Sequence, residues 1–239
     1  MARATRLPAK FLRAVDICRG AARSEARTRA ASRRSRLLNE YRKVLTAAMV
    51  GACGYGRRMA VALVESYGDL LAVLEDDRRA HSLAVGRKAE AAAAGIAPTL
   101  RVDLTVAAVL HDIGYGHVET GFHPLDGARF LAREGFSPVV CNLVVHHSAS
   151  TYEAEERGID LAVYADFAVD QDLSEAHAVL WWADMTTGPQ GQDMTVEERL
   201  AEICGRYGPD AVVTRFIGRA RSVLLAAGQS PAGSVQVRS

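Results

Sequence analysis

One stretch constrains the fold of this chain more than any other. It is an apolar run from Leu104 to Leu110 that leads directly into His111-Asp112. Because its apolar residues recur at helical spacing, we expect a buried helix that carries an adjacent imidazole and carboxylate at its C-terminal end, with Gly114 ending the helix. Two such polar side chains in an apolar setting need a partner, and a metal ion would satisfy both at once.

Matching donors occur on both sides of this stretch. His81 lies in a segment that is typical of a helix from Asp76 to Ala94, and Asp184 closes the apolar segment 178–184. Between them the chain carries His123, which precedes a proline as at the first turn of a helix, and the pair His146-His147. The order is therefore a lone His, then His-Asp, then further histidines, then a distant Asp.

This order resembles the HD-domain superfamily of metal-dependent phosphohydrolases, over about residues 70 to 225. The segments Gly121 to Ala128 and Val145 to Ser148 resemble the additional histidines of its binuclear branch, whose pattern is H…HD…H…H…D. The resemblance implies a catalytic pair, His111 and Asp112. It also implies a first ion held by His81, His111, Asp112 and Asp184, and a second, bridged by Asp112, held by His123 and His146, with His147 the less favoured alternative. His123 follows His111 by only 12 residues, so the sequence leaves one or two ions per chain open.

Imidazoles and carboxylates without thiolates suit a divalent ion of Mn, Fe, Ni, Co or Zn. A water that bridges two such ions loses a proton near neutral pH and becomes a nucleophile. Arg78, one turn before His81, and Lys88 are the cations that we expect to meet a substrate phosphate. We expect the remaining histidine of this region, His177, to be structural or exposed.

The leading hypothesis is a metal-dependent phosphohydrolase that cleaves a phosphate ester or anhydride of a small phosphorylated metabolite, in particular a nucleotide. The pattern is similar to that of HD-type symmetrical dinucleoside tetraphosphate hydrolases and cyclic-dinucleotide phosphodiesterases. The Gly-Tyr-Pro signature of the latter is absent, since Ser148-Ala149-Ser150 follows His147. The alternatives are a non-catalytic metal- or nucleotide-binding HD module and a di-iron HD-type oxygenase.

Charge is distributed unevenly along the chain. Residues 1–43 hold 13 of the 29 Lys and Arg but 3 of the 28 Asp and Glu. Residues 44–239 therefore hold 16 basic and 25 acidic residues, a net charge of −9. This balance favours a small phosphorylated substrate over nucleic acid for the folded domain. Four isolated cysteines and the lack of a long apolar run favour a cytoplasmic protein without a membrane span. An exported lipoprotein, faintly suggested by Arg33-Arg34 and Cys53, is the less favoured alternative.

The expected fold is all-α, an HD-domain helical bundle over residues 41–227. Residues 1–40 are expected to be a basic, disordered or loosely helical extension, and residues 228–239 a flexible tail. Helix-start patterns stand at His123-Pro124, Ser137-Pro138, Ser174 and Thr195, and a last helix is expected over 210–227. We expect the acidic segment 148–173 to be a connector rather than a lid.

Overall fold

The computed structural model of the protein describes residues 39, 41, 43, 67 and 70–228. The chain divides into two compact units, Met1–Glu40 and Tyr41–Ser239, and all elements named below belong to the second. The expectations for the basic extension, the export-signal alternative and residues 229–239 concern segments that lie, except for Asn39, outside the described residues.

The described part of the chain is helical, which confirms the all-α prediction. Its only β contact is an isolated bridge between Thr187 and Asp193. The main helices are α3 (Asp76–Ala92), α4 (Pro98–Leu110), α5 (His123–Glu134), α6 (Pro138–Val145), α7 (Ser150–Glu156), α8 (Ser174–Met185), α9 (Val196–Tyr207) and α10 (Val212–Gly228). Short 3-10 helices connect them: η2 (Leu71–Val73), η3 (Ala93–Gly95), η4 (Ile113–Gly116), η5 (His147–Ala149), η6 (Leu161–Phe167) and η7 (Gln171–Leu173). None of the described helices is long and apolar enough to cross a bilayer.

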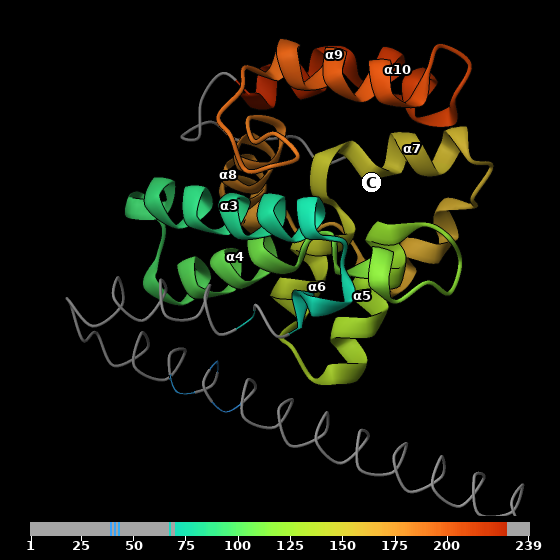
Figure 1. Ribbon diagram of the computed structural model, residues 1–239. Helices are drawn as coiled ribbons and strands as arrows, with labels where there is room; N and C mark the ends of the chain where they lie inside the picture. Colours follow the sequence, from blue (N-terminus) through green and yellow to red (C-terminus); the bar gives the residue numbers. More distant parts are fainter. Residues whose placement is uncertain (1–38, 40, 42, 44–66, 68–69, 229–239) are drawn as a thin grey trace, which may run out of the picture. The chain divides into compact units, whose positions relative to one another are not determined.

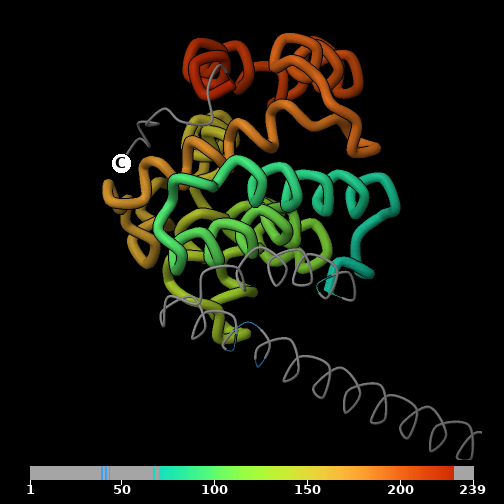
Figure 2. Tube along the Cα trace, turned by 90° about the vertical axis from the view of Figure 1, so that its left-hand side faces the viewer, coloured from blue at the N-terminus to red at the C-terminus, as the bar shows by residue number. Residues whose placement is uncertain are grey.

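Helix α4 lies at the centre of the bundle. It packs against α3, α6 and α8, and its side chains from Val102 to Leu110 are buried on every face (Figure 1). Apart from Asp103 and Thr105 this buried stretch is apolar, and a helix with apolar residues on every face is stable only when its neighbours surround it. Helices α9 and α10 pack on each other and form a separate layer over α7 and α8 (Figure 2).

The predicted helix starts are confirmed. The Ser137 hydroxyl caps α6 by accepting the backbone N–H of Val140, and Thr195 and Glu198 form a reciprocal capping box at the start of α9. Proline occupies the first turn of α4, α5 and α6, where its missing N–H costs nothing.

Two segments differ from the expectations. Helix α4 ends at Leu110, before the expected Gly114, because the backbone leaves the helical region at Asp112 (φ −95°, ψ 4°). The segment 148–173, expected to be a connector, contains the helix α7. The acidic composition of this segment predicted an exposed connector, but α7 has an inner face on which Thr151, Glu153 and Ala154 are buried.

The loop between η4 and α5 is held by one buried carboxylate. Asp126, fully buried in the first turn of α5, accepts the backbone N–H groups of Glu119, Thr120 and Gly121 at 2.9–3.1 Å and the Thr120 hydroxyl at 2.7 Å. Burial alone would raise the pKa of Asp126, but these hydrogen bonds bring it below its ordinary value. The loop therefore depends on an ionised Asp126.

We predict that Asp126→Asn lowers the free energy of unfolding by about 2–3 kcal/mol at pH 7, because an amide loses the charge-assisted hydrogen bonds. Since the folded-state pKa is depressed, this contribution is complete above the unfolded value of about 3.9 and is lost as the pH falls through the folded value. Urea unfolding at several pH values from 7 downwards checks this. The difference in the free energy of unfolding between wild type and variant should narrow in acid, whereas the exposed control Asp172→Asn should change the free energy of unfolding little.

Candidate metal centre

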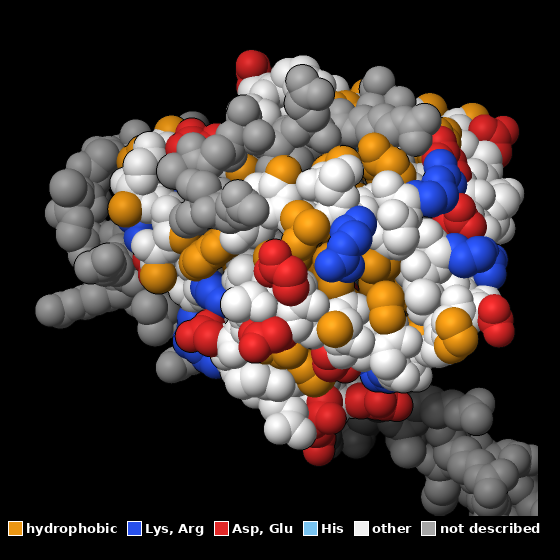
Figure 3. Space-filling model, turned by 90° about the horizontal axis from the view of Figure 1, so that it is seen from above, with side chains coloured by type: hydrophobic (Ala, Val, Ile, Leu, Met, Phe, Trp, Pro, Cys, Tyr) orange, Lys and Arg blue, Asp and Glu red, His pale blue; other side chains and the backbone are white. Residues whose placement is uncertain are grey.

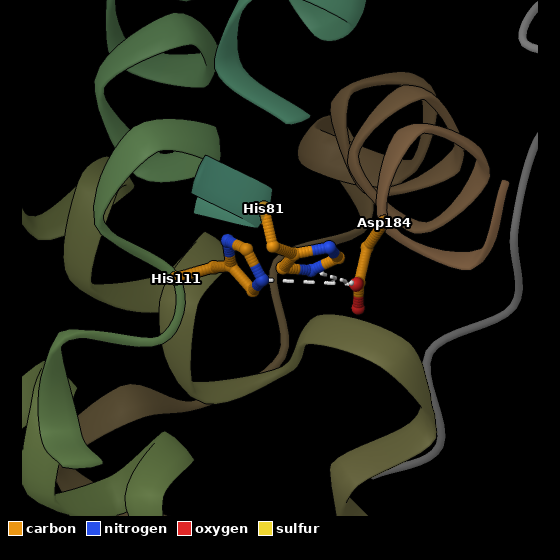
Figure 4. A group of neighbouring side chains, drawn as sticks. All are labelled: His81, His111 and Asp184. Carbon is orange, nitrogen blue, oxygen red and sulfur yellow. Dashed lines mark hydrogen bonds and ion pairs between the residues drawn. The ribbon is translucent and has the colours of Figure 1, made fainter. Parts of the chain in front are cut away.

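Three buried side chains from three helices meet in the core. His81 comes from α3, His111 from the end of α4 and Asp184 from the last turn of α8 (Figure 4). One potential ligand atom of each lies within 4.8 Å of those of the other two. The Nε2 atom of His81 is 3.0 Å, and that of His111 is 3.7 Å, from Oδ1 of Asp184. This set is called the first cluster.

A second cluster lies beside the first and consists of Asp112, His123 and His147, again within 4.8 Å of one another. Nε2 of His123 is 3.4 Å from Oδ1 of Asp112 and 3.3 Å from Nε2 of His147. The other carboxylate oxygen of Asp112, Oδ2, is 3.7 Å from Nε2 of His111 in the first cluster. Asp112 therefore lies between the two clusters, with Oδ1 toward His123 and Oδ2 toward His111.

The hydrogen bonds of the imidazoles decide whether these clusters suit a cation. His81, His111 and His147 each place Nδ1 at 2.6–3.1 Å from a backbone carbonyl, of Gly188, Ala108 and Val144 respectively. A carbonyl only accepts, so Nδ1 carries a proton in each ring, and Nε2, which points inward, is the nitrogen that can offer a lone pair to a metal ion. Nε2 of His111 is buried without any hydrogen-bond partner among the described residues. Inward lone pairs that face carboxylate oxygens need a cation between them, so the donor set fits a divalent metal ion.

The protonation states agree with this conclusion. Burial would raise the pKa of Asp112 and of Asp184, but the neighbouring histidines, together with Arg78 beside Asp112, hold both pKa values below the ordinary range. Burial lowers the pKa of His111 and of His123. Ionised carboxylates and neutral imidazoles are the forms that bind metal ions.

The clusters open into a cavity of about 100 Å³. Arg78 lies at its wall and donates to Oδ2 of Asp112 at 2.5 Å, while its guanidinium stacks 3.6 Å from the centre of the Tyr115 ring. Tyr115 in turn stacks on His123, with the ring centres 4.1 Å apart. The predicted phosphate-binding cation Arg78 is thus present in the cavity, and its side chain is 24% exposed.

The position expected for His146 is occupied by its neighbour. Helix α6 ends at Val145, and the backbone leaves the helical region at His146 (φ −100°, ψ 10°), while the bond of Nδ1 to the Val144 carbonyl orients His147 in the second cluster. His146 points the other way, with Nε2 2.7 Å from the carbonyl of Phe167. His146 therefore links α6 to η6, and we correct the second-cluster histidine to His147.

Lys88 does not belong to the cavity wall formed by the described residues. Its ammonium donates to the Thr186 carbonyl and to Asp193, both at 2.7 Å, and so fastens the turn after α8 onto α3. This pairing removes the basis for Lys88 as a phosphate ligand.

His177 is buried with Nε2 3.2 Å from Oδ1 of Asn142, in agreement with the structural role expected for it.

The sequence alone did not single out several residues that surround the clusters. Ser148 donates to Oδ2 of Asp184, and Glu153 from α7 and Arg199 from α9 line the cavity. Each lies far along the chain from the His and Asp residues it faces. The one local signal was the spacing of Arg199, Ile203 and Tyr207, which places them on one face of α9.

A helical bundle with two neighbouring His/Asp clusters, each able to hold a metal ion, is typical of proteins that bind divalent metals. The HD-domain family model matches residues 78–210, more than half of the chain, so the protein belongs to the HD-domain superfamily. No curated protein and no solved structure matched the chain.

A close approach of two backbones positions His123. A Cβ added to Gly114 in η4 would lie 2.0 Å from the carbonyl oxygen of His123 and 2.6 Å from the amide nitrogen of Gly127. Only glycine permits this contact, which packs η4 against the first turn of α5. The glycine thus places Asp112, two residues before it, next to His123.

We predict that Gly114→Ala lowers the free energy of unfolding by about 1–3 kcal/mol and reduces metal binding, because α5 must move away from η4. Gly205→Ala in α9 is the matched control, since a Cβ there meets nothing within 4 Å. That control should be neutral or stabilising by up to about 1 kcal/mol. Urea unfolding with metal analysis measures both, and equal stability of the two variants would contradict the proposed role of Gly114.

Proposed function

We propose that the protein is a metal-dependent phosphohydrolase that cleaves a phosphate ester or anhydride of a small phosphorylated metabolite, of which nucleotides are the leading class. The observation that carries this proposal is the convergence of inward imidazole lone pairs and two ionised carboxylates on a cavity bordered by Arg78. Membership in the HD-domain superfamily supports it independently.

In this proposal each cluster would hold one metal ion. His81, His111 and Asp184 would hold one ion of Mn, Fe, Ni, Co or Zn, and Asp112, His123 and His147 a second. A divalent ion bound there supplies positive charge beside a phosphoryl oxygen and acidifies a bound water. Ser148, by donating to Asp184, orients that carboxylate toward the first cluster.

Arg78 is the group that recognises the phosphoryl group in this proposal. Burial would lower its pKa, but the Asp112 carboxylate raises it above the ordinary value, so the guanidinium stays charged. Stacking on Tyr115 fixes the plane of the guanidinium while leaving part of its edge toward the cavity. A planar cation held this way can donate two hydrogen bonds to one phosphoryl group.

The size of the cavity and the charge of the body favour a small substrate over nucleic acid. A cavity of about 100 Å³ suits the phosphoryl end of a small molecule rather than a nucleic-acid strand. The cysteines that the structure describes, Cys141 and Cys204, are free, which agrees with a cytoplasmic protein.

The decisive experiment measures metal content per chain together with phosphate release from a phosphodiester and a nucleotide panel, on protein purified without oxygen. Asp112→Asn should reduce turnover by at least about 100-fold, because it alters both clusters. Mutating a residue that only hydrogen-bonds to a metal ligand typically costs about 10- to 100-fold in activity. The exposed Asp172→Asn serves as control. Full turnover by Asp112→Asn would refute the mechanism. Oxygen consumption without phosphate release would favour the oxygenase, and metal or nucleotide binding without turnover the non-catalytic module.

The adjacent histidines offer a matched test of the second cluster. We predict that His147→Ala lowers the metal content per chain, whereas His146→Ala leaves the metal content unchanged and lowers stability, because His146 bonds to the carbonyl of Phe167. Elemental analysis and thermal unfolding of both variants distinguish the two roles. Loss of metal from His146→Ala alone would reverse the assignment.

A further inference from the structure

The cavity has a second wall that the clusters do not use. Helices α9 and α10 supply it, and they form a layer apart from α3 (Figures 1 and 2). Its apolar members are Ile203, Tyr207, Val213, Phe216, Ile217 and Leu224. Two arginines of α9, Arg199 and Arg206, border the same cavity.

Arg199 is unusual for a helix-surface arginine because it is only 8% exposed. Its Nε is buried and has no hydrogen-bond partner among the described residues, and one terminal nitrogen donates to Glu202 at 2.5 Å. A buried donor of a charged group that lacks a partner costs about 1–3 kcal/mol or more. A buried arginine with an unpaired Nε at the wall of a cavity indicates that its remaining N–H groups donate to a ligand.

The charges on this wall leave an excess of positive charge. Glu202 is shared by two arginines, since Arg199 donates to its Oε2 and Arg206 lies 3.1 Å from its Oε1. One carboxylate therefore balances two guanidinium groups. The outer face of this layer carries side chains of both signs among hydrophobic ones (Figure 3). Arg199 is the more buried of the two arginines, and its Nε has no hydrogen-bond partner among the described residues.

We propose that Arg199 binds a second oxyanion of the substrate, a phosphate or carboxylate remote from the bond that is cleaved. The substrate class is then an organic phosphate with two anionic groups, whose apolar or aromatic body contacts Ile203, Phe216 and Ile217. Arg78 meets the phosphoryl group at the clusters, and Arg199 meets the distal anion on the opposite wall. This inference rests on the proposed function for the identity of the reacting end.

Apolar neighbours strengthen such an interaction. A hydrogen-bonded ion pair surrounded by Phe216, Ile217 and Ile203 is less screened by water than one at the surface. A substrate that lacked the distal anion would leave Arg199 without its partner. Discrimination on this basis exceeds what a purely apolar pocket can achieve.

Binding of two hydrolysis-resistant probes tests the inference separately from catalysis. Phenylphosphonate carries one anionic group, and 4-carboxyphenylphosphonate adds a second at the far end of the ring. Calorimetric titration of the full chain gives a Kd for each. We expect the wild type to prefer the carboxylated probe and Arg199→Gln to lose at least about tenfold of that preference, the scale of a charge-assisted hydrogen bond. Arg199→Lys should retain part of it.

Glu202→Gln supplies a test in the opposite direction. Removing the carboxylate that competes for Arg199 should increase the preference for the carboxylated probe, and this variant leaves the buried arginine in place if Arg199→Gln does not fold. The matched control is Arg219→Gln on α10, an exposed arginine paired with Glu155 and Glu156, which should not change the preference.

Two outcomes overturn the inference: equal affinity of the wild type for both probes, or an unchanged preference in both Arg199→Gln and Glu202→Gln. Neither depends on turnover. Failure to release phosphate from any substrate, with the Arg199-dependent preference intact, would instead refute the hydrolase and leave the distal anion site standing.

Discussion

The centre depends on a hydrogen bond between an imidazole and a carbonyl at the end of a helix. The last four carbonyls of a helix have no partner within it. Ala108 in α4 and Val144 in α6 lie in such last turns, and each receives the Nδ1–H of the histidine three residues later. The same local device thus turns His111 and His147 with Nε2 toward the core. His81 is turned by a carbonyl from the loop after α8.

Because these orientations are fixed by the backbone, the two clusters share a common electrostatic character. Burial pushes the carboxylates toward their neutral form, and the neighbouring imidazoles and Arg78 oppose it more strongly. Burial at the same time keeps the imidazoles neutral. Without the neighbouring positive charge, the buried carboxylates would not stay ionised, which is the form that binds a metal ion. The central helix α4, whose residues from Val102 to Leu110 are all buried, contributes the low-polarity surroundings that make these effects large.

The sequence was sufficient to predict the helical fold, the helix starts at His123, Ser137 and Thr195, and the meeting of His81, His111 and Asp184. These follow from periodicity, capping residues and the order of the donors. The choice between His146 and His147 could not be read from the sequence, because it depends on where α6 ends and on which carbonyl each ring meets, that of Phe167 for His146 and that of Val144 for His147. Lys88 failed as a candidate because its partner, Asp193, is distant in the sequence.

Helices α9 and α10 contribute to the cavity but donate no member of either cluster. They are fastened to the rest of the bundle by packing on α7 and α8 and by the ion pairs of Arg215 and Arg219 with α7. Because of this separation, substitutions in α9 and α10 and substitutions in the clusters affect different properties of the site. Substitutions on the inner face of α9 and α10 can change which molecules are accepted while the donors of both clusters stay intact. Relatives that share this bundle could therefore diverge in substrate through these two helices alone, with the reactive centre inherited unchanged.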